Sequence, residues 1–165
     1  MPAPTPGYVK NMIRRSLREI IDPSPSKKDE NKIWEFFQNQ CAYCGTQVQK
    51  SQKGVQLQKT KKEGHIDHLL PSSLSGPNYI SNRVLACATC NQAEKLDGEW
   101  HEFILSKNKA LDLARARIAK IHEWQELNGK PVLDKDKLRQ IEKLSDSAVA
   151  FYQAKVNEAR KLRFS

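Results

Sequence analysis

Two short stretches decide the fold of this chain: residues 64–73, GHIDHLLPSS, and residues 81–95, SNRVLACATCNQAEK. Residues 64–70 and 82–86 each predict a short strand, and the Ser-, Gly- and Pro-rich residues 71–78 between them predict a loop. A helix is expected to begin at about Thr89 and to reach about Asp97. The predicted order is therefore strand, loop, strand and helix.

The second stretch ends on one of two Cys-x-x-Cys pairs. The four cysteines of the chain, Cys41, Cys44, Cys87 and Cys90, all fall in these pairs. Two such pairs are the usual way to offer four thiolates to one tetrahedral zinc ion. The alternatives are two separate redox motifs, or buried cysteines that hold no metal. Gly45 fits a zinc knuckle, where the backbone turns its amides towards sulfur.

Helical patterns flank this central part. Apolar residues recur with helical period at 9–21 and 28–38, and again over 99–127, which predicts one long helix. Asp134 is placed to cap a last helix, and residues 46–62 suggest a short hairpin. We interpret His101, His122 and the three tryptophans, Trp34, Trp100 and Trp124, as structural rather than as ligands or base-stacking groups.

The net charge of +9 on 165 residues favours a polyanionic partner over an acidic one. The alternative is a solvated Lys-rich surface, and charge alone does not separate the two. Lysines crowd the segment before the first strand: Lys50, Lys53, Lys59, Lys61 and Lys62. No apolar run is long enough for a membrane span, and residues 1–7 have no signal-peptide character, so we expect a cytoplasmic protein.

Three polar residues of the two stretches suit hydrolysis of a phosphodiester bond. That reaction needs a base for the attacking water and positive charge beside the phosphate. His68 is a candidate base near neutral pH. Asp67 and Asn91 offer the oxygen ligands that Mg²⁺ prefers. Adjacent strand residues face opposite ways, so Asp67 and His68 share one site only if the strand twists or bulges there. Read alone, such a pair is more often a surface pair than a catalytic one.

Taken together, these residues resemble the HNH nuclease motif, the ββα-metal finger. The matching positions are Asp67-His68 at the end of the first strand, Pro71 and Ser72 after it, Asn82 opening the second strand, and Asn91 on the helix. Asn at the last position is a familiar variant of the name-giving His. Many members also carry two Cys-x-x-Cys pairs around the motif. The resemblance covers about residues 38–98.

The resemblance implies a role for each residue. His68 is the expected general base, Asp67 and Asn91 the expected ligands of one Mg²⁺ or Mn²⁺, and Asn82 a scaffold that ties the loop down and helps orient His68. The four cysteines are the expected ligands of a structural Zn²⁺. The sequence departs from the family in one respect. The family often has Lys three residues after the helix Asn, whereas here Glu94 holds that position and Lys95 follows.

The expected fold class is α+β: a small zinc-bound ββα-metal core flanked by N-terminal and C-terminal helices, mostly helical overall. We expect an N-terminal helical arm at 1–37, the nuclease core at 38–99 and a C-terminal helical hairpin at 100–165. Nucleic-acid contacts are expected from Lys59, Lys61, Lys62, Arg83 and Lys95. His65, two residues before Asp67, either touches substrate or is structural.

The sequence predicts a metal-dependent endonuclease acting most naturally on double-stranded DNA. One rival is a zinc-stabilised nucleic-acid-binding module without catalysis. The presence of both Asp67 and His68 is evidence against it. A second rival is a zinc-bearing protein–protein adaptor, for which the basic charge is unsuited. Phage defence, restriction, a mobile element and a multi-subunit complex all fit such an enzyme. Because one HNH site cuts one strand, double-strand cleavage requires a homodimer, two binding events or a partner subunit.

Overall fold

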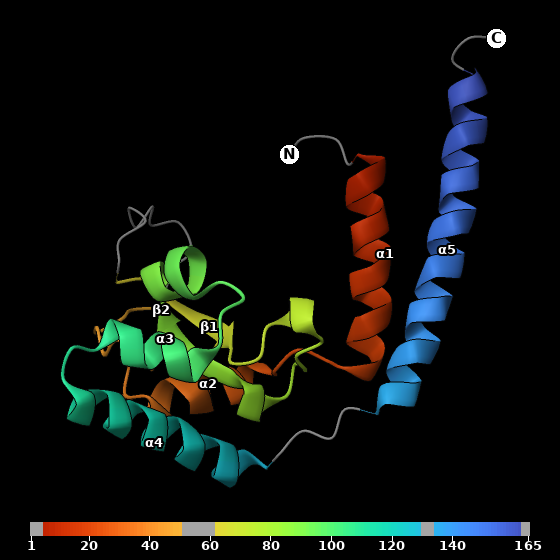
Figure 1. The fold of residues 1–165 in the computed structure, drawn as a ribbon. Coiled ribbons are helices and arrows are strands. Elements are labelled where there is room, and N and C mark those ends of the chain that lie inside the picture. The colour runs from red at the N-terminus through yellow and green to blue at the C-terminus, as the bar shows by residue number, and fades with distance from the viewer. Residues whose placement is uncertain (1–4, 51–61, 130–133, 163–165) are drawn as a thin grey trace. The chain divides into compact units, whose positions relative to one another are not determined.

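The computed structural model describes residues 5–50, 62–129 and 134–162 (Figure 1). These residues form two compact units. One is Ser24–Pro131, and the other combines Met1–Pro23 with Val132–Ser165. The division into functional segments at 1–37, 38–99 and 100–165 stays a prediction, because compactness alone does not say which segments function together.

The larger unit contains a two-stranded antiparallel sheet. Strand β1, Gly64–His68, pairs with β2, Arg83–Cys87, with Gly64 opposite Cys87 and His68 opposite Arg83. Both predicted strands are therefore confirmed to within about two residues at each end. Strand β2 is the more deeply buried, and its residues 84–87 all lie in the core. The loop between the strands begins where β1 ends, beside the start of β2.

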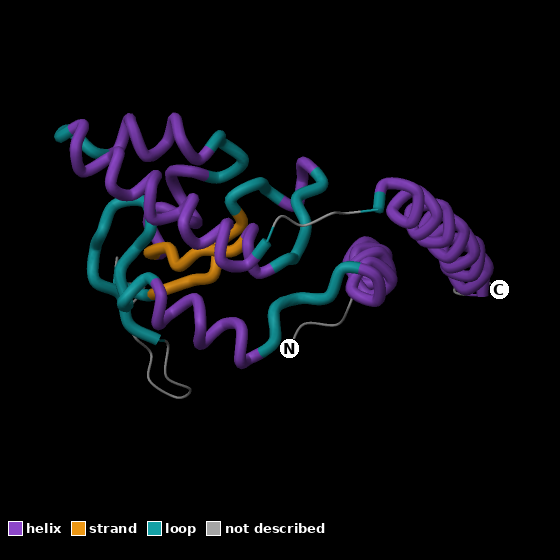
Figure 2. Tube along the Cα trace, turned by 90° about the horizontal axis from the view of Figure 1, so that it is seen from below, coloured by secondary structure: helices purple, strands orange, loops and turns teal. Residues whose placement is uncertain are grey.

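Helix α2, Lys27–Phe36, lies next to β2 and leads into the first cysteine pair (Figure 2). It begins with a capping box in which the side chains of Ser26 and Asp29 each accept a hydrogen bond from the other residue's backbone amide. Such a box satisfies two amides that the first helical turn leaves open. The helix buries Ile33 and Trp34, and Phe37 follows in the core. Packing of this apolar side of the helix therefore positions the start of the segment 38–44, which carries the first cysteine pair.

A wide helical turn follows β2. Residues 88–89 are α-helical, and Cys90–Lys95 continue as a π-helix. Widening a helix in this way accommodates one additional residue in a turn, and such turns often occur at functional sites. The helix ends at Leu96, whose φ of 47° is rare for a residue with a side chain.

The expected single helix over 99–127 is wrong, because the chain forms two helices there. These are α3, Trp100–Lys107, and α4, Leu111–Asn128, which pack on each other. The break lies at Asn108, whose side-chain amide donates to the carbonyls of Tyr43 and Ile104 and accepts from Arg117. An Asn side chain that bonds backbone in this way competes with helical hydrogen bonding. The break thus ties α3 and α4 to the first cysteine pair.

The expectation that the tryptophans belong to the core is confirmed. Trp34, Trp100 and Trp124 are all buried. The indole of Trp124 also donates to the carbonyls of Ile80 and Arg83, at 3.1 and 2.8 Å. Helix α4 therefore supports the backbone on which β2 begins.

The second unit consists of α1, Pro6–Ile21, and α5, Lys135–Leu162, which lie side by side (Figure 1). Helix α1 begins on Thr5, which accepts from the amide of Tyr8. Asp134 accepts from the amides of Asp136 and Lys137 at the start of α5, which confirms its predicted capping role. None of the helices described is both long and apolar enough to cross a membrane.

Candidate functional site

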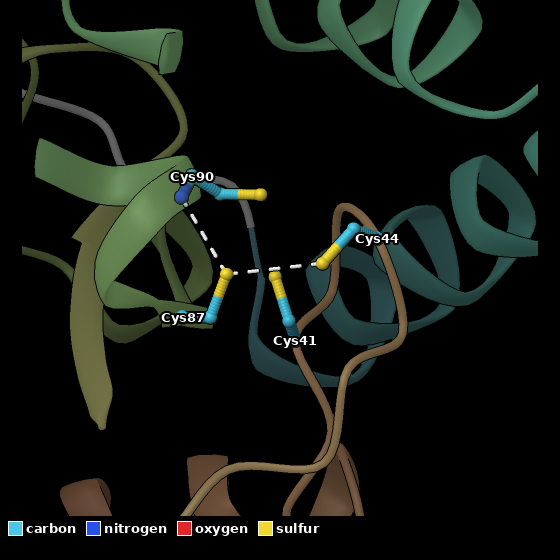
Figure 3. Close-up of side chains that lie close together, drawn as sticks. All are labelled: Cys41, Cys44, Cys87 and Cys90. Atoms are coloured by element: carbon cyan, nitrogen blue, oxygen red, sulfur yellow. Dashed lines mark hydrogen bonds between the residues drawn. The ribbon is translucent and has the colours of Figure 1, made fainter. Parts of the chain in front are cut away.

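The two cysteine pairs come together although 42 residues separate Cys44 from Cys87 (Figure 3). The four Sγ atoms lie within 4.8 Å of one another, and those of Cys44 and Cys87 are 3.8 Å apart. Sulfurs bound tetrahedrally to one zinc at about 2.3 Å would stand about 3.8 Å from each other. All four cysteines are free of disulfides. The cluster therefore has the donor type, number and spacing of a structural zinc site.

Local backbone geometry shapes each knuckle. Gly45 has a φ of +74°, which glycine adopts without strain, and its amide donates to the carbonyl of Cys41 at 2.8 Å. A side chain at this position would also meet the guanidinium of Arg117. In the second knuckle the amide of Cys90 points at the sulfur of Cys87, at 3.5 Å. A hydrogen bond from Cys41 lowers the pKa of Cys87 to about 7, which favours a thiolate there.

A polar cleft lies between the end of β1 and the π-helical turn. Asp67, His68, Asn91 and Lys95 all line it, together with Pro71, Ser72, Ser73, Leu96 and Asp97. The ladder between β1 and β2 continues without a bulge to His68, where β1 ends. Asp67 and His68 nevertheless both line the cleft, with His68 as the last residue of β1.

One oxygen of Asp67 receives two donors. The hydroxyl of Tyr43 donates to Oδ2 at 2.7 Å, and the ammonium of Lys95 lies 3.2 Å from the same atom. Burial, reinforced by the nearby Asp67 carboxylate, raises the pKa of Tyr43 well above its usual value. The phenol therefore keeps its proton and acts as a donor. These two contacts hold one oxygen of the Asp67 carboxylate in place at the cleft.

The imidazole of His68 is held by an amide of the loop between the strands. Its Nε2 lies 3.1 Å from Oδ1 of Asn78, and the guanidinium of Arg83 contacts the same oxygen. An amide oxygen only accepts hydrogen bonds, so Nε2 carries the proton. In the neutral ring Nδ1 then has the lone pair, which is the property that a general base requires.

Asn82 ties down both ends of this loop. Its amide oxygen accepts from the backbone of Leu70 at 2.9 Å, and its nitrogen donates to the carbonyls of Leu70 and Pro77 at 3.0 and 2.8 Å. The side chain is almost completely buried, with Asn82 only 5% exposed. Its contacts therefore hold the loop that carries Asn78, and no direct contact between Asn82 and His68 is among them.

The expected nucleic-acid contacts are scattered. Lys59 and Lys61 lie outside the described residues, and Lys62 is exposed at the edge of the described part. Arg83 is half-buried against Asn78. The side chain of Lys95 is 1% exposed, so its packing gives no support to the predicted phosphate contact. Lys95 is the last residue of the π-helical turn, and its ammonium lies 3.2 Å from Oδ2 of Asp67.

Two residues of this site were not predicted from the sequence. Tyr43 stands between the first two cysteines, and Asn78 stands in the polar loop. Their positions carried no catalytic pattern, and their contacts with Asp67 and His68 appear only in the folded chain. His65 lies 4.0 Å from the carboxylate of Glu63, and its contacts do not decide between its two readings.

Comparison with known proteins agrees with this geometry. The family model of HNH endonucleases matches residues 41–96, a range that contains all four cysteines and the cleft residues Asp67, His68 and Asn91. A relative from Bacillus subtilis (strain 168), the SPbeta prophage-derived putative HNH endonuclease YoqL, is 34% identical over 96 residues. The matched stretch covers 56% of this chain and only 38% of the length of that relative. Over residues 41–96 this chain is therefore similar to HNH endonucleases.

Proposed function

We propose that the chain is a metal-dependent endonuclease that hydrolyses phosphodiester bonds in nucleic acid. The observation that carries this proposal is the cleft in which Asp67, His68 and Asn91 meet. These residues provide a carboxylate, an imidazole and an amide at one place, which is the set that metal-assisted hydrolysis requires.

Two kinds of metal site fit the donors. Cys41, Cys44, Cys87 and Cys90 would hold a structural Zn²⁺, because four sulfurs at this spacing suit its tetrahedral geometry. Oxygens of Asp67 and Asn91 would hold one Mg²⁺ or Mn²⁺. When bound, that ion supplies positive charge beside the phosphate and the departing oxygen.

His68 acts as the general base. Nδ1 takes a proton from water as the water oxygen forms its bond to phosphorus. The bond between phosphorus and the departing sugar oxygen then breaks, and that oxygen takes up a proton from solvent. Asn78 keeps the proton on Nε2 and so presents Nδ1 to the water. Asn82 acts at one remove, because it holds the loop that carries Asn78.

Double-stranded DNA is the proposed substrate. The net charge of +9 favours a polyanion, and phosphate contacts need charge and reach rather than a motif. Work on phage-related or foreign DNA, in defence or restriction, is the proposed setting, and the name of the relative from B. subtilis points to a prophage origin of that protein. Cleavage of both strands would involve a homodimer or a partner subunit. The rival function is a zinc-stabilised module that binds nucleic acid without cutting it.

A plasmid cleavage assay separates the two functions. Supercoiled and linear DNA, and RNA, are incubated with the wild type in Mg²⁺, Mn²⁺ or EDTA. We expect cleavage of DNA that requires a divalent ion, and a loss of at least about 10² to 10⁴ in rate for His68→Ala with zinc content and DNA binding unchanged. Asp67→Ala and Asn91→Ala should also abolish cleavage, and raised Mn²⁺ should restore part of it. Cleavage by His68→Ala at the wild-type rate would refute the role of His68 as the base. DNA binding without any cleavage by the wild type would favour the rival.

A further inference from the structure

Lys95 is a buried ammonium at the floor of the cleft. Its Nζ lies 2.8 Å from the carbonyl oxygen of His68 and 3.2 Å from Oδ2 of Asp67, and 5.6 Å from the centre of the Tyr43 ring. The side chain of Lys95 is 1% exposed and that of Asp67 12% exposed. A charge pair so far removed from water is screened only weakly by solvent and salt.

The charges that line the cleft nearly cancel at its floor. Asp67 contributes one negative charge, Lys95 one positive charge, and Asn91 none. Asp97 adds a second carboxylate, but it stands on the exposed rim, where water screens its charge. A divalent cation approaching Asp67 would therefore meet a carboxylate that Lys95 already neutralises. Tight binding of Mg²⁺ or Mn²⁺ in proteins depends on carboxylates whose charge is not offset in this way.

From these charges we propose that Lys95 neutralises Asp67 in the free protein, so that the divalent cation enters the cleft together with a phosphate of the nucleic acid and not before it. This inference rests on the proposed function, which makes Asp67 the metal ligand. The phosphate supplies the negative charge that the protein lacks. The consequence is selectivity for nucleic acid, because the cleft would hold its catalytic ion only when a phosphodiester is bound there.

The helical turn after β2 determines which of its side chains reach the cleft. The π-helical turn Cys90–Lys95 keeps Asn91 on the cleft and turns Lys95 inward beneath it. The neighbouring Glu94 points away from this floor and pairs with Lys107. The negative charge of Glu94 is thus placed beside Lys107, and the positive charge of Lys95 is placed beside Asp67.

Direct measurement of Mn²⁺ binding tests the inference without any cleavage. Electron paramagnetic resonance reports free Mn²⁺ in titrations of the zinc-loaded full chain. Compared with the wild type, Lys95→Met and Lys95→Gln should bind Mn²⁺ at least about tenfold more tightly, because a buried positive charge beside the ligand is gone. Lys120→Met, which removes a lysine that lies over Phe36 and Phe37 away from the cleft, is the matched control and should bind like the wild type. Thermal unfolding of each variant establishes that it is folded.

A second measurement uses a protein with Lys95 intact. His68→Ala, which we expect to have lost cleavage, should bind Mn²⁺ at least about tenfold more tightly when a DNA duplex is present, and by reciprocity Mn²⁺ should strengthen its binding of the duplex by the same factor. If both Lys95 variants are unfolded, this comparison of Mn²⁺ binding with and without DNA still tests the inference. Equal Mn²⁺ affinity with and without DNA, or Lys95 variants that are folded and bind Mn²⁺ like the wild type, would overturn the inference.

Asp67→Asn distinguishes this failure from a failure of the proposed function. If Asp67→Asn removes Mn²⁺ binding while the Lys95 variants leave it unchanged, Asp67 is the ligand and only the role of Lys95 is wrong. If Asp67→Asn binds Mn²⁺ as well as the wild type does, with or without DNA, the metal assignment itself is wrong.

Discussion

Asn82→Ala is expected to destabilise the larger unit and to disable the cleft in the same step. The amide of Asn82 makes three hydrogen bonds to backbone groups of Leu70 and Pro77, at 2.8 to 3.0 Å. Each is worth about 1 kcal/mol net, and the buried carbonyl of Pro77 would lose its bond without gaining water. The substitution should therefore lower the free energy of unfolding by about 3 kcal/mol. Since this loop carries Asn78, His68 should also lose its orientation.

Urea unfolding of the zinc-saturated protein, followed by tryptophan fluorescence, measures the stability change. Asn128→Ala is the matched control, because the amide of Asn128 makes one hydrogen bond, to the carbonyl of Trp124 near the end of α4. It should cost about 1 kcal/mol or less and leave plasmid cleavage unchanged. If Asn82→Ala stays within about 0.5 kcal/mol of the wild type, the loop does not depend on these bonds, and our account of how His68 is positioned is refuted.

Three further predictions concern the cysteine cluster, the orientation of His68 and the affinity for DNA. Cys87→Ser should lower the zinc content measured by atomic absorption, destabilise Ser24–Pro131 and reduce cleavage, because structural zinc contributes folding free energy; a variant that folds and cuts normally would contradict this. Asn78→Ala should lower the cleavage rate by about 10 to 100-fold with zinc content and thermal stability retained, and an unchanged rate would mean that His68 is oriented by other groups. Changing Lys59, Lys61 and Lys62 together to Gln should reduce the slope of log DNA affinity against log salt concentration, by up to about one for each lysine that contacts a phosphate. An unchanged slope would place the contact surface elsewhere.

Patterns in the sequence located the elements and the main cleft residues, but not the contacts that orient them. Both strands and the cysteine pairs follow from local spacing, and β1 and β2, which are consecutive strands of the chain, pair in antiparallel fashion. The contact of Tyr43 with Asp67 spans 24 residues and that of Lys95 with His68 spans 27. Contacts at such separations depend on how α2, the knuckles and the sheet pack together, which no local period encodes.

The break between α3 and α4 was missed for a related reason. Apolar residues continue with helical period through the break, so the pattern alone predicts one helix. The competing term is the side chain of Asn108, which bonds the carbonyl of Tyr43 across the fold and accepts from Arg117. A single polar residue with tertiary partners thus outweighs the propensity of its neighbours, as tertiary context commonly does.

The cysteine cluster and the cleft are structurally coupled, because one knuckle contacts the cleft residue Asp67 and the other carries the cleft residue Asn91. Tyr43 lies between Cys41 and Cys44 and donates to Asp67, while Asn91 directly follows Cys90. Asp67 comes from β1, so two knuckle residues and a strand residue converge only when both cysteine pairs are held together. A zinc ion bound to the four sulfurs would therefore set the distance between the two oxygen ligands proposed for the catalytic ion. Losing one thiolate should misplace both ligands by way of Tyr43 and Asn91, although none of the four cysteines lines the cleft.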